Sequence, residues 1–323
     1  MDKLNTFIEL MNSYGASEEP FLFIIDFDIK RPEIHKLSEL PEGIKVSTPC
    51  YSNISSGQKK RKPFTLIKYP VSFERYFKSF TNIQQNIKLG NSFLVNLTFP
   101  TVVETELSLE DIFYRSFAKY KLLYHDSFVV FSPETFVKIS DGEIKSFPMK
   151  GTIDASVPKA ETAIINDQKE MAEHNTIVDL IRNDLSIISE NVEVTKFRYI
   201  DRIKTSEGEL LQVSSEITGK ISKDYKNLYG DIITKMLPAG SVTGAPKKET
   251  VRIIKESEEY DRGWYTGVFG VFDGRILDSA VMIRFIEKDA ERYIYKSGGG
   301  ITFLSDPEKE YEELILKVYV PVG

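Results

Sequence analysis

Cysteine, histidine and tryptophan are scarce in this chain of 323 residues, which holds one cysteine, three histidines and one tryptophan. The single cysteine, Cys50, excludes a disulfide bond within the chain and a zinc site built from several cysteines. Neither a disulfide bond within the chain nor a zinc site built from cysteines can therefore stabilise the fold.

Long apolar runs and an excess of positive charge are also missing. No apolar run reaches membrane-spanning length, and the start, Met1 to Leu4, lacks the basic stretch and apolar core of a signal peptide. Acidic residues outnumber basic ones by 48 to 42, and the net charge of -6 disfavours nucleic acid as the main partner. The basic run Lys59-Lys60-Arg61-Lys62 precedes Pro63 and favours a solvated loop. We expect a cytoplasmic protein that binds neither membranes nor nucleic acid.

The composition is that of a globular protein, since 41% of the residues are hydrophobic and 28% are charged. A chain of this length can bury a large core as one domain or as two that pack closely. Asp141-Gly142 and Asp273-Gly274 each lie between apolar runs and predict tight antiparallel hairpins. Strand-like runs cover 21–28, 92–99, 127–139, 192–203, 210–221, 264–272, 277–287 and 293–297. Helical periodicity covers 109–120, 158–188, 225–236, 246–259 and 307–319. This order indicates an α+β fold with helices covering antiparallel sheets.

Lys150 lies at the end of a strand-like run, between Pro148 and Gly151. A lysine at that place has little helix surface along which its stem could lie, and Gly151 permits another segment to approach closely. In a closed pocket, burial lowers the pKa of a lysine from its usual value of about 10.4, and the neutral amine is a nucleophile. A surface lysine beside a turn is the alternative that this residue alone leaves open.

Two acidic pairs lie at the buried sides of predicted helices. Glu170 and Glu173 continue a helix face whose next turns are apolar, and Glu310 and Glu313 border the apolar stripe of a last helix that Asp306 caps. Burying unpaired carboxylates costs several kcal/mol each, and a divalent cation can hold two of them together. Convergence of both helices on one Mg2+ is our hypothesis, with solvated helix faces as the alternative.

Two glycine-rich segments, 239–247 and 297–301, can present backbone N–H groups to an anion. Neither has the glycine spacing of a nucleotide-binding loop, so small carboxylates suit them better than polyphosphates. Arg284 interrupts an apolar strand. It predicts either a bidentate contact with a carboxylate or a structural salt bridge.

Several segments, taken in chain order, resemble the chorismate-utilising enzymes. The motifs are Ser132-Pro133-Glu134, Lys150-Gly151-Thr152, Ala172-Glu173-His174 with the helix that follows, Gly244-Ala245-Pro246-Lys247, Arg262-Gly263-Trp264-Tyr265-Thr266-Gly267 and Asp306-Pro307-Glu308-Lys309-Glu310-Tyr311-Glu312-Glu313. The resemblance covers about residues 71–320. It implies the family's α/β/β/α sandwich of orthogonally packed antiparallel sheets flanked by helices. It also implies a chorismate-binding catalytic domain at 71–323, with 1–70 as a short N-terminal segment packed on it and truncated relative to the family.

Position 150 separates the activities within that family. A lysine in a Pro-x-Lys-Gly-Thr context resembles the aminodeoxychorismate-forming members, whereas the anthranilate-forming relatives carry alanine there. Isochorismate and salicylate synthases have a water-activating lysine at the position that corresponds to Leu94. The resemblance therefore implies conversion of chorismate and ammonia to 4-amino-4-deoxychorismate, in p-aminobenzoate and folate biosynthesis. Anthranilate formation is the close alternative, and a noncatalytic carboxylate-binding scaffold subunit is the alternative from another class.

The resemblance also implies roles for individual residues. Lys150 would attack ring carbon 2 of chorismate while Glu134 protonates the departing 4-hydroxyl, which requires a lowered pKa for Lys150 and a raised pKa for Glu134. Glu173 and Glu310 would bind Mg2+ directly, with Glu170 and Glu313 close to the ion or its waters. The residues that would hold the substrate carboxylates are Thr152, Tyr265, Arg284, Gly244, Gly298, Gly299 and Lys317.

No glutaminase is expected within the chain. Cys50 lies in Pro49-Cys50-Tyr51, without a glycine-flanked nucleophile elbow, and the chain has only three histidines. Ammonia should therefore come from a separate glutamine amidotransferase subunit or from solution.

Overall fold

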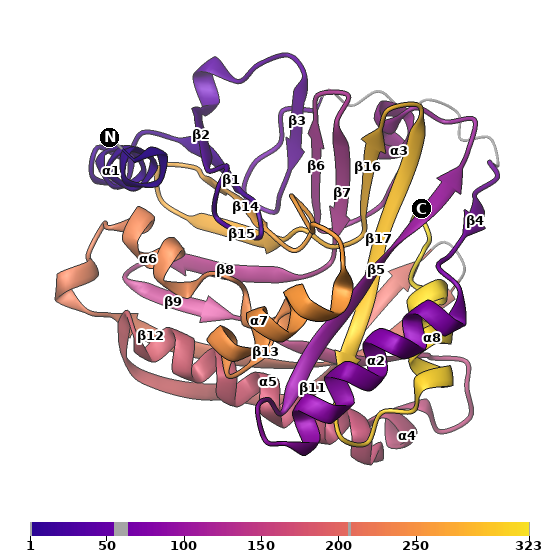
Figure 1. Ribbon diagram of the computed structural model, residues 1–323. Helices are drawn as coiled ribbons and strands as arrows, with labels where there is room; N and C mark the ends of the chain where they lie inside the picture. Colours follow the sequence, from indigo (N-terminus) through magenta and orange to yellow (C-terminus); the bar gives the residue numbers. More distant parts are fainter. Residues whose placement is uncertain (1, 55–63, 206–207, 323) are drawn as a thin grey trace.

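A computed structural model of the protein describes residues 2–54, 64–205 and 208–322. The basic run at 59–62 lies outside the described residues. The described chain forms two antiparallel sheets, and the strands of one run across those of the other in Figure 1. None of the described helices is long and apolar enough to cross a membrane.

The first sheet contains nine of the described strands, and every pairing in it is antiparallel. The strands are β1 (Phe21–Ile25), β2 (Glu33–Lys36), β8 (Thr135–Ser140), β9 (Glu143–Ser146), β10 (Met149–Asp154), β11 (Ser189–Thr205), β12 (Gly208–Ile221), β14 (Val268–Phe272) and β15 (Leu277–Val281). They lie in the order β10, β12, β9, β8, β15, β14, β1 and β2, and β11 also pairs with β12.

The second sheet contains eight of the described strands, again all antiparallel. The strands are β3 (Ile44–Ser47), β4 (Ile67–Tyr69), β5 (Leu94–Glu104), β6 (Tyr120–Tyr124), β7 (Phe128–Ser132), β13 (Gly244–Ala245), β16 (Phe285–Asp289) and β17 (Arg292–Ile301). They lie in the order β13, β5, β17, β16, β7, β6 and β3, and β4 also pairs with β5.

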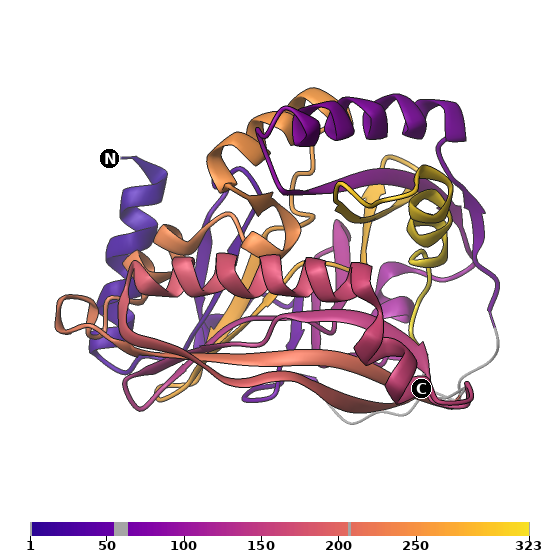
Figure 2. The same cartoon turned by 90° about the horizontal axis from the view of Figure 1, so that it is seen from below.

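Helices cover the outer faces of both sheets. They are α1 (Lys3–Ala16), α2 (Phe73–Lys88), α3 (Leu109–Arg115), α4 (Ala160–Asn166), α5 (Gln168–Ser186), α6 (Tyr229–Met236), α7 (Lys247–Glu258) and α8 (Pro307–Leu316), with short 3-10 turns at Leu37–Glu39, Lys223–Tyr225 and Gly240–Val242. Figure 2 shows α2 and α7 over β5, with α5 lying along the sheet that contains β11 and β12.

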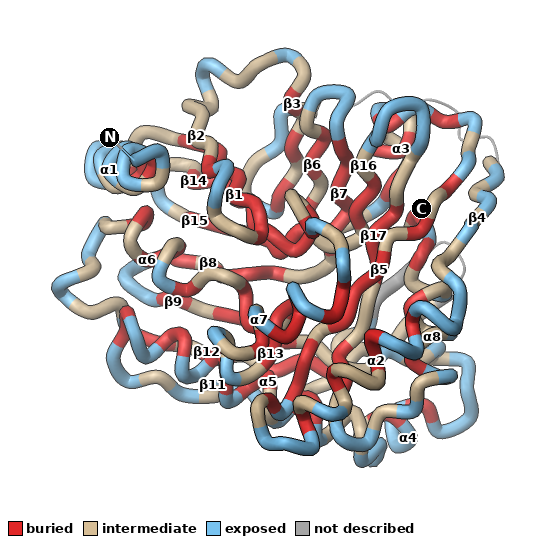
Figure 3. Tube along the Cα trace, viewed as in Figure 1, coloured by how far each residue is buried: buried red, intermediate tan, exposed pale blue. Residues whose placement is uncertain are grey.

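The apolar clusters follow this layering. One cluster joins α1, α5 and α6 to the first sheet, and a second lies between the sheets, where Leu22 and Phe269 of the first pack with Ile44 and Phe128 of the second. Two further clusters join the second sheet to α3 and to α2, α7 and α8. Figure 3 accordingly shows buried residues along the strands of both sheets and exposed ones on the outer turns. The α+β fold with two antiparallel sheets flanked by helices is confirmed.

Local signals explain several element boundaries. Both predicted hairpins form, because Asp141-Gly142 joins β8 to β9 and Asp273-Gly274 joins β14 to β15. Asp306 caps α8 by accepting hydrogen bonds from two backbone N–H groups, and Pro307 follows at the first helical position. In each case a short polar or glycine signal stands where the chain must turn.

Three predicted elements are each broken in two. The run 127–139 is β7 followed by β8, and 277–287 is β15 followed by β16, so the chain changes sheet within each run. The predicted helix 158–188 is α4 followed by α5, because Asp167 is extended and caps the second helix. Helix 109–120 ends at Arg115, and the helices α1 and α2 were missed.

The first 70 residues take part in both sheets. β1 pairs with β14 and β2, all five of its residues are buried, and β3 and β4 pair with strands of the second sheet. The domain boundary near residue 70 stays a prediction.

Candidate active site

The site lies where the chain passes from one sheet to the other. Glu134 stands between β7 and β8, and Arg284 stands between β15 and β16. The two crossings are bonded to each other, since Val281 N–H donates to the Glu134 carbonyl at 3.2 Å and Phe131 N–H donates to the Arg284 carbonyl at 3.0 Å. Residue Pro133 has no N–H for a sheet ladder, and Arg284 has a left-handed φ of 53°, so both crossings interrupt regular pairing.

Glu134 has the protonation tendency that an acid catalyst needs. Burial raises the pKa of its carboxyl above the usual value, although a hydrogen bond from Ser241 and the charges of Lys150, Arg284 and Lys317 lower the pKa in part. These three cations therefore lie near one carboxyl group. The mechanism that the resemblance implies requires a raised pKa for the Glu134 carboxyl, and burial of this carboxyl raises it.

Lys150 lies on β10, just before a bulge at Gly151, whose φ is +77°. Its Nζ lies 3.2 Å from Glu173 Oε2. A Cβ added to Gly300 would lie 3.3 Å from that same Nζ and 2.9 Å from Leu94 Cδ1, so the amine and Leu94 meet above the glycines of β17. The Lys150 amine therefore lies between Glu173 and Gly300, next to Leu94.

The pKa of Lys150 is raised, opposite to the expected direction. Burial lowers it, but the nearby charges of Glu173, Glu170 and Glu313, together with the hydrogen bond to Glu173, outweigh burial. The expectation considered burial alone and missed the carboxylates that converge on the amine. In this arrangement Lys150 is an ammonium group.

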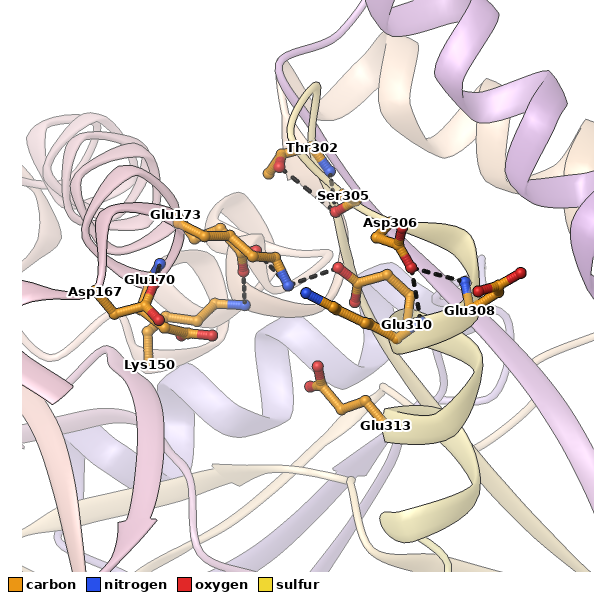
Figure 4. Close-up of polar contacts among 12 residues, drawn as sticks. Lys150, Asp167, Glu170, Glu173, Thr302, Ser305, Asp306, Glu308, Glu310 and Glu313 are labelled. Atoms are coloured by element: carbon orange, nitrogen blue, oxygen red, sulfur yellow. Dashed lines mark hydrogen bonds and ion pairs between the residues drawn. The ribbon is translucent and has the colours of Figure 1, made fainter. Parts of the chain in front are cut away.

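The two acidic helices converge, as Figure 4 shows for Glu173 on α5 and Glu310 on α8. Lys169 Nζ joins their carboxylates, at 3.5 Å from Glu173 Oε1 and 2.6 Å from Glu310 Oε1. Both Oε1 atoms are buried, and they share Lys169 as an ion-pair partner. Buried carboxylate oxygens that face one another fit an oxygen-preferring divalent cation.

The second member of each acidic pair lies next to the first. Glu170 has a pKa raised by burial and by the charge of Glu173. Glu313 contacts Lys317 at 2.6 Å, and a Cβ at Gly299 would lie 3.6 to 3.8 Å from Glu310, Lys317 and Glu313. Within the described ranges, no group of three or more acidic, histidine or cysteine side chains is arranged as a ready metal site. The assignment of Mg2+ stays a prediction.

A cationic side of the site, formed by Arg284 and Lys317, lies near Glu134. Arg284 is half-buried, its buried Nε has no hydrogen-bond partner among the described residues, and its guanidinium lies 5.1 Å from the ring centre of Tyr319. No carboxylate in the described part of the chain forms an ion pair with it, so the structural salt bridge that the sequence left open is not made there. Lys317 donates to the Gly298 carbonyl at 3.0 Å. Such a side suits a carboxylate ligand.

Tyr265 lies at the same side. Its side chain is buried, and burial raises the pKa of its phenol while the charges of Arg262 and Arg284 lower it. Its phenol therefore lies near Arg284 as a neutral hydroxyl.

Two predicted substrate contacts are placed differently. Thr152 follows the bulge, is exposed, and accepts a hydrogen bond from Gln212 at 3.3 Å, whereas Lys150 pairs with the buried Val213. Gly244 has a φ of +133°, and a Cβ there would lie 1.8 Å from the Leu94 carbonyl oxygen. The structure thus turns Thr152 away from Lys150 and gives Gly244 a packing role between β13 and β5.

Three residues near the site escaped prediction. Lys169 joins two acidic residues, Ser241 donates to Glu134, and Asn96 pairs with Gly300 across β5 and β17, with a buried Oδ1 that lacks a partner. Only Ser241 had a signal, since it lies in a glycine-rich segment already singled out. Lys169 and Asn96 reach the site through contacts between segments that lie far apart in the chain.

Comparison with known proteins identifies the family. The chain matches the chorismate binding enzyme family over residues 24–322. It is 48% identical over 322 residues to an uncharacterized PabA-like protein of Pasteurella multocida, covering 99% of both chains. It is 30% identical over 326 residues to a Schizosaccharomyces pombe protein provisionally named aminodeoxychorismate synthase, covering 91% of this chain and 44% of that protein.

A solved structure supports the fold. A Bacillus anthracis protein, provisionally named a 2,3-dihydroxybenzoate-specific isochorismate synthase, superposes with a TM-score of 0.74 at 21% identity over 98% of this chain and 88% of that one. Sequence match and fold agree, and the chain belongs to the chorismate binding enzymes.

Proposed function

We propose that this protein is component I of an aminodeoxychorismate synthase, which converts chorismate and ammonia to 4-amino-4-deoxychorismate. The observation that carries the proposal is the position of Lys150, whose amine lies beside Leu94 and Gly300. Once deprotonated, this amine is a nucleophile, whereas the residue beside it, Leu94, cannot activate water. Catalysis is assigned to residues 71–323, with 1–70 packed on that part.

Each step uses a residue with a defined place. The Lys150 amine forms a bond to ring carbon 2, the ring double bond shifts, and the bond from carbon 4 to its hydroxyl breaks as Glu134 gives its proton and water leaves. Ammonia then bonds to carbon 4, the double bond shifts back, and Lys150 departs from carbon 2. Glu134 takes up the proton that the new amine loses, which restores both residues.

The acidic side supports substrate binding. Glu173 and Glu310 would hold Mg2+ directly, and Glu170 and Glu313 would lie beside it. A bound Mg2+ would supply positive charge at these carboxylates and a ligand position for a substrate carboxylate. Arg284, Tyr265 and Lys317 are proposed to bind the other carboxylate.

Lys150 must lose a proton before it can attack. The carboxylates of Glu173, Glu170 and Glu313 now keep its pKa high. Deprotonation therefore requires that the charge of these carboxylates be balanced by other cations, among which Lys169 already contacts Glu173.

Ammonia is proposed to come from a separate glutamine amidotransferase subunit or from solution. To test the function, the purified chain is incubated with chorismate, Mg2+ and ammonium, the products are identified by mass spectrometry, and pyruvate is assayed. An amino product that keeps its enolpyruvyl group supports the proposal. Pyruvate release with fluorescent anthranilate refutes the proposal and supports the alternative, anthranilate formation. Chorismate binding without any product would point to a scaffold subunit.

A further inference from the structure

The loop between α6 and α7 is tied to the rest of the protein on several sides. Lys247 Nζ, at its end, donates to the Met236 carbonyl at its start, at 2.7 Å, and lies 2.6 Å from Asp184 Oδ2 on α5. Asn96 N–H donates to the Thr243 carbonyl at 2.8 Å. A loop with its ends joined and its middle bonded to β5 has little freedom to move.

Ser241 lies in this loop, and its Oγ donates a hydrogen bond to Glu134 Oε1. The loop is fixed near Ser241 as well, since Arg262 donates to the Val242 carbonyl at 2.8 Å. A second serine, Ser132, accepts a hydrogen bond from the Glu134 backbone N–H at 3.1 Å. Both the backbone and the carboxyl group of Glu134 are therefore held.

We propose that Ser241 is a positioning residue for Glu134, and that the pair Lys247 and Asp184 holds the loop that carries it. The inference rests on the proposed role of Glu134 as the acid. A carboxylic acid has two oxygens, and a hydroxyl that donates to Oε1 leaves the proton on Oε2. After Oε2 has given its proton to the leaving hydroxyl, the same hydrogen bond stabilises the carboxylate that remains.

The Lys247 and Asp184 pair has no other evident task. Both side chains are largely buried, and burial raises the pKa of Asp184 and lowers the pKa of Lys247, while each is countered by its partner. Asp184 comes from the helix that also carries Glu173. One helix therefore supplies a carboxylate to the acidic side and an anchor for the loop that reaches Glu134.

The variant Ser241→Ala tests the inference. We expect kcat to fall about 10- to 100-fold, the loss of one hydrogen bond to a charged group, while the KM for chorismate changes by less than about threefold. Ser241→Thr keeps a hydroxyl and should recover most of the rate. Ser189→Ala is the matched control, because Ser189 is a buried serine that donates instead to the Leu185 carbonyl at 2.6 Å.

The pH profile separates positioning from a general structural role. Activity requires protonated Glu134, so the rate falls as pH rises through the pKa of Glu134. Burial raises this pKa, whereas the Ser241 hydrogen bond and the charges of Lys150, Arg284 and Lys317 lower it. Loss of the Ser241 hydrogen bond removes an influence that lowers this pKa. The alkaline limb of Ser241→Ala should therefore move to higher pH, and an unchanged limb with an unchanged kcat overturns the inference.

A titration without turnover keeps this inference distinct from the proposed function. Carbon-13 NMR of the Glu134 carboxyl should show a higher pKa in Ser241→Ala than in the wild type, even if the wild type forms no amino product. Equal pKa values would refute the hydrogen bond. For the loop anchor, Lys247→Met with Asp184→Leu removes both charges together and should shift the pKa in the same direction. If that double variant does not fold, Ser241→Ala alone decides.

Discussion

Two groups of buried ionic side chains differ in how fully their hydrogen bonds are made. The Arg262 cluster, formed by Arg262, Glu258 and Thr98, is closed: Arg262 donates to Glu258 Oε2 at 2.8 Å and Oε1 at 2.6 Å, and Thr98 donates to Oε1 from its backbone and its hydroxyl at 2.8 Å each. Both charged side chains are 1% exposed. The cluster joins α7 to β5 and offers nothing to a ligand.

The site cluster, formed by Lys150, Lys169, Glu173 and Glu310, is open. Its carboxylates are 5% and 2% exposed, but its lysines are 20% and 31% exposed, and the buried Oε1 atoms of Glu173 and Glu310 share one ion-pair partner, Lys169. Carboxylates that share one partly exposed lysine are less fully satisfied than Glu258, and incomplete satisfaction of buried charge costs stability. The difference supports the proposal that the open cluster serves binding and catalysis, whereas the closed one serves structure.

The largest expected effect is on Lys150. Lys150→Ala removes the nucleophile and should lower amino product formation on the order of 10⁴-fold or more. Stability should change little, because the lysine is partly exposed and Lys169 still contacts Glu173. Product mass spectrometry and denaturant unfolding measure the two effects. Intact mass after a substrate quench should show an adduct in the wild type that this variant does not form.

Next comes Glu134. Glu134→Gln cannot donate the proton and should lower kcat by about 10²- to 10⁴-fold. Because burial raises the pKa of Glu134, the wild-type rate should decline with rising pH at a value above that of an ordinary glutamate. The variant should lack this limb in its residual activity. A limb that persists in Glu134→Gln would assign the acid to another group.

Substitution of Arg262 should mainly lower stability, whereas substitution of Lys150 should mainly lower activity. Arg262→Met leaves Glu258 buried without its partner and should lower the free energy of unfolding by about 3 to 5 kcal/mol. The matched control is Arg252→Met, because its exposed contacts with Glu249 and Glu256 are screened by solvent and should contribute little to stability. Urea unfolding measures both. Equal losses in the two variants would contradict the distinction between a closed buried cluster and surface pairs.

The smallest expected effect concerns Mg2+. If the open cluster binds the ion, Mg2+ at about 100 times its Kd should stabilise the wild type by about 2.7 kcal/mol, seen as a rise in Tm. Glu310→Gln should lose most of this rise, whereas Glu312→Gln, on the exposed side of α8, should keep it. A rise that Glu310→Gln retains in full would remove Glu310 from the proposed ligand set.

Motifs predicted the family and several local structural features, because these signals are local in the sequence. The capping signal at Asp306, the two hairpins and the glycine after Lys150 each act within a few residues. The breaks inside 127–139 and 277–287 were not predicted, since the apolar content of each run continues across the change of sheet. Yet Glu134 and Arg284 lie at those breaks.

Neighbouring residues were enough to predict the fold class, the family and the two acidic helices, because hydrophobic periodicity and helix caps depend on residues close together in the chain. Folding brings carboxylates around Lys150, joins Glu173 to Glu310 through Lys169, and carries Ser241 to Glu134. These contacts join residues far apart in the chain. The pKa of a buried group depends on every charge around it, and spacing along the sequence does not specify which charges those are.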